Sequence, residues 1–222
     1  FSGKTYVTVM NMHGRGAIGG PNERAEVAIS GRIGPIGPDY PEPAFNLHAT
    51  GRNLCSEPAL MAAMPAEVRQ ALKTFDAPGQ GQFPQFRGNF TCNIVKPPGA
   101  HQRWTFDTDL DLLDASGCVV GFPYPLTNIR GRLKVRGGYV DVVQVTMARG
   151  SVSAVASGRV RWADDQGHDQ PLDMNLKISA RSLPIDRDLM GALPVEQSAA
   201  LKKLGIGGKL KADGRIFTVV AP

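Results

Sequence analysis

The chain has 222 residues, of which 42% are hydrophobic and 20% are charged, and it carries a formal net charge of +5 at pH 7. This balance is typical of a folded globular protein and argues against intrinsic disorder. The basic residues are scattered along the chain, which indicates a solvated surface and no nucleic-acid partner.

Most of the chain is predicted to form β-strands, because apolar residues alternate with polar ones and many are β-branched or aromatic. Gly137-Gly138 and Arg149-Gly150 predict tight turns between consecutive strands, which implies an antiparallel meander. The apolar positions change parity between Val142 and Val143, which predicts a β-bulge there or a strand covered on both faces. The predicted strands are residues 4–10, 23–32, 44–50, 82–95, 103–113, 128–135, 139–148, 151–162, 172–180 and 208–220.

Part of the sequence occurs twice. Residues 54–73 (LCSEPALMAAMPAEVRQALK) and residues 183–202 (LPIDRDLMGALPVEQSAALK) share nine of twenty positions at a constant offset of 129. The run Ser30-Gly31-Arg32 recurs as Ser157-Gly158-Arg159 at an offset of 127. The extent of the match predicts a module of about 130 residues that is used twice, and therefore an elongated architecture.

Each copy of the repeat is predicted to contain a helical segment that begins around a proline. Pro65 and Pro194 are each followed two residues later by a glutamate, which suits the positive end of the helix dipole. A short helical turn is expected before each proline, and Gly79 and Gly205 are expected to end the helices.

Residues at helical spacing form a stripe in each copy, and we expect the stripe of the first copy to pack on the sheet. For the first copy a lipid-facing surface is the alternative. The stripes contain Leu60, Met61, Met64 and Leu72 in the first copy, and Gln197, Leu201 and Leu204 in the second.

The predicted fold is mainly β with short helices, an elongated and curved antiparallel sheet built from two repeats, each with one inserted helical segment. The first module spans residues 1–102 with a helix near 58–75, and the second spans 103–222 with a helix near 187–204. One continuous sheet is expected, because residues 128–162 supply hairpins without interruption across the join.

No motif predicts catalysis, a cofactor or a metal site. Residues 13–19 contain G-x-G-x-x-G, but a strand-like run follows where a dinucleotide site needs a helix, so we predict a glycine-rich loop. Asp107, Asp109 and Asp111 have the spacing of one solvated strand face, and the glycine and glutamate of a calcium loop are missing. An enzyme site assembled only in three dimensions, around His48, His101 or His168, is the remaining alternative. We expect no enzyme.

The three cysteines, Cys55, Cys92 and Cys118, do not form a C-x-x-C pair. Small buried thiols are the simplest interpretation. A disulfide between Cys92 and Cys118 is the alternative if the compartment is oxidising.

Several motifs follow one another in a distinctive order. They are Leu-Pro-Ile-Asp at 183–186, Leu-Met-x-Ala-Leu-Pro at 189–194, a helix ending near Leu204 and then a glycine-led strand, preceded by Gly-Phe-Pro-Tyr-Pro at 121–125. In this order, over most of residues 23–217, the chain resembles the AsmA-like repeat proteins of Gram-negative envelopes, particularly their planctomycete forms.

The resemblance implies a non-enzymatic periplasmic segment of a long protein anchored in the inner membrane. Such proteins are related to the bridge-like lipid-transfer proteins. Their curved β groove has an apolar interior that is thought to carry phospholipid toward the outer membrane. The expected partners are phospholipid and neighbouring modules of the same longer chain, with the membrane anchor outside this fragment.

A groove of this kind would be lined by the alternating apolar side chains of the strands predicted at 139–148 and 151–162. A structural or protein-interaction module that binds no lipid is the alternative function. The residues predicted to contact lipid are Val140, Val142, Val152, Ala154, Ala156, Val160 and Trp162.

Overall fold

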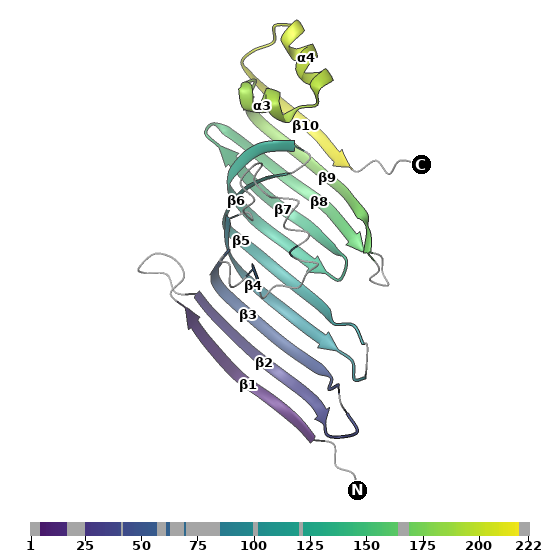
Figure 1. Ribbon diagram of the computed structural model, residues 1–222. Helices are drawn as coiled ribbons and strands as arrows, with labels where there is room; N and C mark the ends of the chain where they lie inside the picture. The colour runs from purple at the N-terminus through teal and green to yellow at the C-terminus, as the bar shows by residue number, and fades with distance from the viewer. Residues whose placement is uncertain are drawn as a thin grey trace.

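The computed structural model describes residues 5–16, 25–40, 42–56, 61–62, 69, 85–99, 102–119, 122–163 and 169–217. Within these ranges the chain forms one open antiparallel sheet of ten strands, with two short helices, α3 and α4, near the C-terminus. Figure 1 shows the strands in a single row, in which each strand lies beside its neighbours in sequence. The predicted mainly β fold and the continuous antiparallel sheet are therefore confirmed.

Most strands are longer than predicted. The strand expected at 128–135 begins six residues earlier, since Pro123 and Pro125 lack an amide hydrogen and hide the strand pattern. The strands are β1 (Thr5–Gly16), β2 (Ala25–Ile36), β3 (Phe45–Cys55), β4 (Gln85–Lys96), β5 (Thr105–Val119), β6 (Phe122–Arg136), β7 (Tyr139–Arg149), β8 (Val152–Ala163), β9 (Asp169–Pro184) and β10 (Lys209–Phe217). The helices are α3 (Arg187–Ala192) and α4 (Val195–Lys203).

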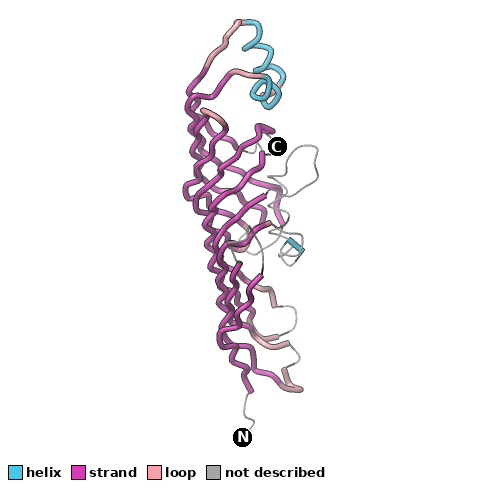
Figure 2. The backbone as a smooth tube through the Cα atoms, turned by 90° about the vertical axis from the view of Figure 1, so that its left-hand side faces the viewer, coloured by secondary structure: helices cyan, strands magenta, loops and turns pink. Residues whose placement is uncertain are grey.

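The sheet is a single layer with one apolar and one polar face, because side chains alternate along each strand. Figure 2 shows the layer from the side, with α3 and α4 on one side of it. The strand register aligns an unbroken row across the apolar face from β2 to β9: Val27, Gly51, Phe90, Leu110, Leu133, Val142, Gly158 and Leu176. The adjacent row on the opposite face is Ala28, Thr50, Thr91, Asp109, Lys134, Asp141, Arg159 and Asn175.

The predicted β-bulge on β7 is confirmed. Val142 and Val145 are both buried on the apolar face, whereas Val143 between them is 48% exposed. The pairing of β7 with β8 and with β6 shifts in register at this place. The inserted residue changes the parity of the apolar positions, as the sequence indicates.

The two predicted hairpin turns are found, one of them displaced. Gly137-Gly138 joins β6 to β7, and Gly138 has a positive φ of 97°. The second turn lies at Gly150-Ser151, one residue later than predicted. Arg149 remains in β7, where it pairs with Val152, and Gly150 supplies the positive φ of 56° that the turn needs.

The loop predicted for the glycine-rich run at 13–19 is wrong in its first part. Residues 13–16 continue β1 and pair with residues 25–28 of β2. A glycine has no side chain to restrict its backbone, so a strand can pass through it when a partner strand supplies hydrogen bonds. Residues 17–19 lie outside the described residues.

Two hairpins in distant parts of the chain have the same register. Gly31 of β2 faces Leu47 of β3, and Gly158 of β8 faces Leu176 of β9. The φ of Gly31 is 142° and that of Gly158 is 143°. At both positions an added Cβ would lie 2.1 Å from the carbonyl oxygen of the residue that precedes the facing leucine.

A matching irregularity lies further along β3 and β9. The pairing of β3 with β4 shifts between residues 51 and 54, and that of β9 with β10 shifts between residues 180 and 183. The first irregularity contains Asn53 with a φ of 51°, and the second contains Ser182 with a φ of 55°. Both sets of positions are 129 residues apart (182 − 53 = 129), which is the offset of the sequence repeat.

The helical segment predicted near 187–204 consists of α3 and α4, separated at Pro194 as expected. The Asp186 side chain caps α3 by accepting a hydrogen bond from Leu189 N at 2.9 Å. Leu189 and Ala192 of α3 are buried against the sheet. Gly205 follows α4 with a φ of 61°, which confirms it as the residue that ends the helix.

The predicted stripe of α4 does not pack on the sheet. Gln197 is exposed, Leu201 is half-buried and Leu204 is 70% exposed, and Ser198 is the buried residue of this helix. Leu193 and Pro194 have extended ψ values of 148° and 145°, which turn the chain away from the path of α3. Only the first of the two helices therefore contacts the sheet with its apolar side.

Little of the helical segment predicted near 58–75 lies within the described residues. Met61 and Ala62 are helical, as is Arg69, and Met61 is 5% exposed. The burial of Met61 agrees with the expectation that this stripe packs on the sheet. Met61 is the one residue of the stripe that lies within the described residues. Leu60, Met64, Leu72, Pro65 and Gly79 lie outside the described residues.

Candidate functional site

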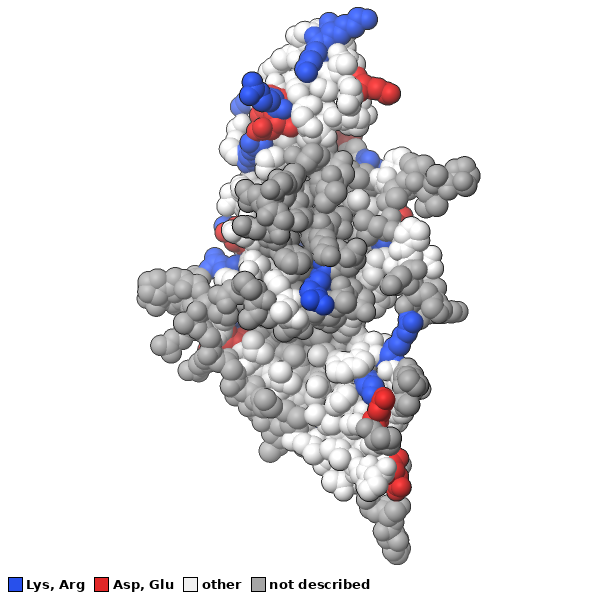
Figure 3. All heavy atoms as spheres, in the orientation of Figure 1, with Lys and Arg blue, Asp and Glu red and all other residues white. Residues whose placement is uncertain are grey.

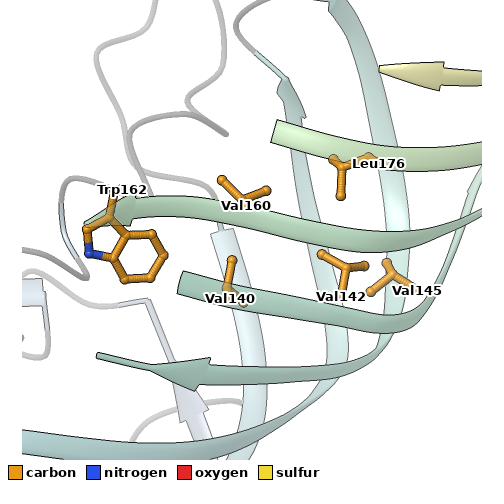
Figure 4. Packing of buried hydrophobic residues seen from close by; sticks show 6 residues of the cluster. All are labelled: Val140, Val142, Val145, Val160, Trp162 and Leu176. Carbon is orange, nitrogen blue, oxygen red and sulfur yellow. The ribbon is translucent and has the colours of Figure 1, made fainter. Parts of the chain in front are cut away.

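The seven residues predicted to contact lipid all lie on the apolar face. They are Val140 and Val142 on β7, and Val152, Ala154, Ala156, Val160 and Trp162 on β8. Each is at most 7% exposed, and Val160 is 1% exposed. Figure 4 shows four of them packed together with Val145 and Leu176. Contact between these side chains and a lipid would therefore require this part of the face to open.

Trp162 places a polar group within this apolar cluster. Its backbone N donates to the Gly138 carbonyl oxygen at 2.8 Å. Its indole Nε1 is buried and has no hydrogen-bond partner among the described residues. A buried donor without an acceptor is unfavourable, so an acceptor atom brought to this point would be stabilised.

The apolar face is more open on the strands nearer the N-terminus. Val7 of β1 faces Ile33 and is 46% exposed. This region differs from the closed cluster on β7 and β8 in that water reaches large apolar side chains. The half-buried residues of the open region are Ile29, Ile33, Phe45, Leu47, Phe90, Ile94, Phe106 and Leu110.

A buried lysine forms an ion pair with a half-exposed glutamate beside this open region, and the sequence alone did not predict this pair. Lys96 is 7% exposed and has the strand parity of the apolar face, opposite Phe45. Its Nζ lies 2.9 Å from Glu42 Oε2 and 5.7 Å from the centroid of the Phe45 ring. The Phe45 and Trp104 ring centroids are 5.3 Å apart. The sequence does contain a signal for this burial. Lys96 follows Phe90, Cys92 and Ile94 at every second position, which places its side chain on the same face of the strand.

Helix α3 covers the C-terminal end of the apolar face. Its buried Leu189 and Ala192 pack with Tyr124, Val152 and Leu183 from three strands. Arg149 of β7 forms an ion pair with Asp188 of α3, and its guanidinium carbon lies 5.1 Å from the centroid of the Tyr124 ring. Burial raises the pKa of Tyr124 above its ordinary value.

The opposite face of the sheet carries alternating charges. Arg136 pairs with Asp107 and Asp109, Arg132 pairs with Asp111 at 2.9 Å, and Arg159 pairs with Asp141 at 2.6 Å. The three aspartates of β5 are 51–54% exposed, so the predicted solvated strand face is confirmed. Figure 3 shows the side of the sheet that carries α3 and α4, where the visible charged groups lie at the helical tip and scattered over the sheet.

The proposed alternative of a Cys92–Cys118 disulfide is wrong. All three cysteines are thiols, and Cys92 faces Thr108 on β5. Cys118 lies ten residues further along β5, which is about 33 Å at the rise of an extended strand. Thr108 Oγ1 donates to Cys92 Sγ at 3.0 Å, and burial raises the pKa of the Cys92 thiol.

The histidines do not meet at one site within the described part of the chain. His48 lies on the polar face, where its Nδ1 is 2.8 Å from Asn93 Oδ1. His101 and His168 lie outside the described residues, as does the side chain of His13. No group of three or more histidine, cysteine, aspartate or glutamate side chains suited to a metal ion occurs among the described residues.

No protein-family model matches the chain, and no curated protein or solved structure is similar to it. Within the described ranges, no helix is both long and apolar enough to span a bilayer.

Proposed function

We propose that this chain is a non-enzymatic segment of an AsmA-like envelope protein that carries lipid along the apolar face of its sheet. The observation that carries the proposal is the unbroken row from Val27 to Leu176, which crosses eight strands without a charged residue. The adjacent row on the other face contains alternating aspartates and basic residues. A surface with this division suits acyl chains on one side and water on the other.

The two-repeat construction forms part of this proposal. The registers at Gly31 and Gly158 agree, as do the irregularities at Asn53 and Ser182. These matches support one module at residues 1–102 and another at 103–222, each with one inserted helical segment. Repeating the module extends the apolar face of the open sheet along the molecule. A protein that carries lipid along its surface needs such a continuous apolar face.

We place lipid contact first on the open region of β1–β5. There the exposed apolar surface is already available, whereas Val140, Val142, Val152, Ala154, Ala156, Val160 and Trp162 are enclosed. These seven residues would continue the track once the face above β7 and β8 opens. The free Nε1 of Trp162 is then placed to donate to a lipid ester oxygen.

The setting of the proposed function follows from the same resemblance. The chain would lie in the periplasm within a longer protein anchored in the inner membrane, and would serve phospholipid transport or outer-membrane homeostasis. Phospholipid and neighbouring modules of the same chain are the proposed partners. No covalent chemistry, metal or cofactor is part of the proposal.

The test is extraction of the purified chain with organic solvent, followed by mass spectrometry of the extract. We expect phospholipid to copurify with the protein in a stoichiometric amount, and to exchange with lipid supplied in vesicles. Protein that contains no phospholipid and takes up none would contradict the proposal.

A structural or protein-interaction module is the second candidate function. Two observations favour it: the enclosed cluster around Val160, and the outer edges of β1 and β10, which have no partner strand among the described residues. An exposed edge presents backbone groups that can pair with a strand from another protein. In that case the chain would bind a peptide strand and would contain no lipid.

A further inference from the structure

Helix α4 leaves apolar side chains in water at the end of the molecule where α3 and α4 project beyond the sheet (Figure 1). Val195 is 85% exposed, Leu204 is 70% exposed and Ile206 is 46% exposed. Val195 and Leu204 are the most exposed of the large apolar residues that the structure describes. Apolar side chains this exposed at the end of a molecule offer a surface that a partner can cover.

A cavity of about 360 Å³ opens beside these residues, between α3 and the end of α4. Its apolar lining comes from Ile185, Met190, Leu201 and Ile206, together with Gly205. Its charged lining consists of Arg187, Lys202 and Asp186. Asp186 is the cap of α3, where its Oδ1 accepts the hydrogen bond of Leu189 N.

The tip carries more basic than acidic side chains. Arg187, Lys202, Lys203 and Lys209 are exposed, and none forms an ion pair with a described residue. Arg149, by contrast, pairs with Asp188 and is held against the sheet. Lys202 and Lys203 directly precede Leu204 at the end of α4, whereas the exposed Glu196 follows Val195 at its start.

We propose that the α3–α4 tip docks on the surface of an anionic lipid bilayer, where Leu204 and Ile206 enter between the headgroups and Arg187 and Lys202 hold a lipid phosphate at the mouth of the cavity. Apolar residues bordered by basic ones favour an anionic membrane, because insertion and charge attraction add together. A protein partner would need acidic groups placed against all four basic residues. This docking does not depend on lipid transport, since the transport track lies on a different surface.

The experiment measures binding of the whole chain to vesicles by flotation. Vesicles of phosphatidylcholine are compared with vesicles that also contain phosphatidylglycerol. We expect binding only to the second kind, and we expect it to weaken as salt is added. Equal binding to both kinds would overturn the proposal.

Two variants separate the charged and apolar contributions. Arg187→Gln with Lys202→Gln is expected to weaken binding about 25-fold, since each basic residue near such a surface contributes about fivefold. Leu204→Ser with Ile206→Ser is expected to weaken it at least about tenfold. The matched controls, Lys134→Gln and Val155→Ser on the polar face, are expected to leave binding unchanged. Circular dichroism checks that every variant is folded.

Three further outcomes would overturn the proposal. Binding of inorganic phosphate by protein that does not float with phosphatidylglycerol vesicles would show a phosphate site and not a bilayer surface. Self-association that is lost in the Leu204→Ser, Ile206→Ser variant would show a contact between copies of this chain. Equal vesicle binding by tip and control variants would show that the tip is not the docking surface. Lipid extracted from the protein is measured separately, so failure here leaves the transport proposal standing.

Discussion

Gly31 and Gly158 occupy the same backbone position in two hairpins whose strands are far apart in the sheet. Their φ values are 142° and 143°, and each faces a leucine across the hairpin. Each also lies so close to the partner strand that a Cβ would meet a carbonyl oxygen at 2.1 Å. A third glycine, Gly131 of β6, has the same close approach, to the Gln144 carbonyl oxygen. The recurrence indicates that a local twist at glycine shapes this sheet.

The substitution Gly158→Ala is expected to destabilise the protein by roughly 2 kcal/mol or more. The added methyl group would force two strands apart at a positive φ that alanine disfavours. Urea denaturation followed by circular dichroism measures the change. Gly214→Ala on β10 is the matched control, because no atom lies within 4 Å of the position of its Cβ. Equal losses in the two variants would contradict the close-approach argument.

A pair of leucine substitutions tests the different roles of α3 and α4. Leu189 is 2% exposed and Leu204 is 70% exposed. We expect Leu189→Ala to lower the free energy of unfolding by about 2–5 kcal/mol, because it leaves a cavity in a packed cluster. Leu204→Ala should change it by less than about 0.5 kcal/mol. A large loss at Leu204 would show that α4 packs on the sheet in solution.

The ion pair of Lys96 and Glu42 is expected to matter more than the pairs on the polar face. Glu42→Gln removes the countercharge of a buried ammonium, and should destabilise the protein by about 1–3 kcal/mol. Asp141→Asn breaks a solvated pair and should alter stability by less than about 1 kcal/mol. Adding Lys96→Met to Glu42→Gln should restore much of the loss. If the double variant is no more stable than Glu42→Gln, the buried charge is not the cause.

Cys92 is predicted to react slowly and with a marked dependence on pH. Burial raises the pKa of its thiol, with a smaller contribution from the Asp107 carboxylate, whereas the hydrogen bond from Thr108 lowers it. The thiolate is the reactive form, so alkylation by iodoacetamide should be slower than for a free thiol and should rise at higher pH. Thr108→Val should raise the pKa further and slow the reaction.

The same shift has a consequence for stability. The folded state favours the neutral thiol, so the contribution of Cys92 to the free energy of unfolding is fully present below the pKa of the unfolded thiol. This stabilisation is lost as the pH rises through the pKa of the folded thiol.

Mass spectrometry of the alkylated protein across the alkaline range measures the reactivity of Cys92. An alkylation rate equal to that of a short cysteine peptide would contradict the burial of this side chain.

The sequence was a good guide to what depends on neighbouring residues. Alternation predicted the strands, the change of parity at Val142 and Val143 predicted the bulge, and Pro194 predicted where α4 begins. Each of these follows from the conformation of a few consecutive residues. The turn predicted at Arg149-Gly150 lies one residue later, because a local pattern does not fix the exact end of a strand.

Features that depend on distant segments were not predictable in the same way. The stripe of α4 has helical spacing, yet two extended residues before it turn the helix away from the sheet. The burial of Lys96 depends on Glu42, which lies 54 residues away. The enclosure of Val160 likewise depends on residues of neighbouring strands. Sequence alternation assigned these side chains to one face, but it could not show how much of that face is open.

In the proposed function, the apolar face contacts lipid and the polar face does not. Leu110 and Asp109 are adjacent on β5, Leu110 half-buried on the apolar face and Asp109 53% exposed on the polar face. Replacing each in turn with a photoreactive benzoylphenylalanine, and irradiating the protein with radiolabelled phospholipid, tests the claim most directly. We predict strong lipid labelling at position 110 and little at position 109. Equal labelling at the two positions, or none at either, would contradict the account.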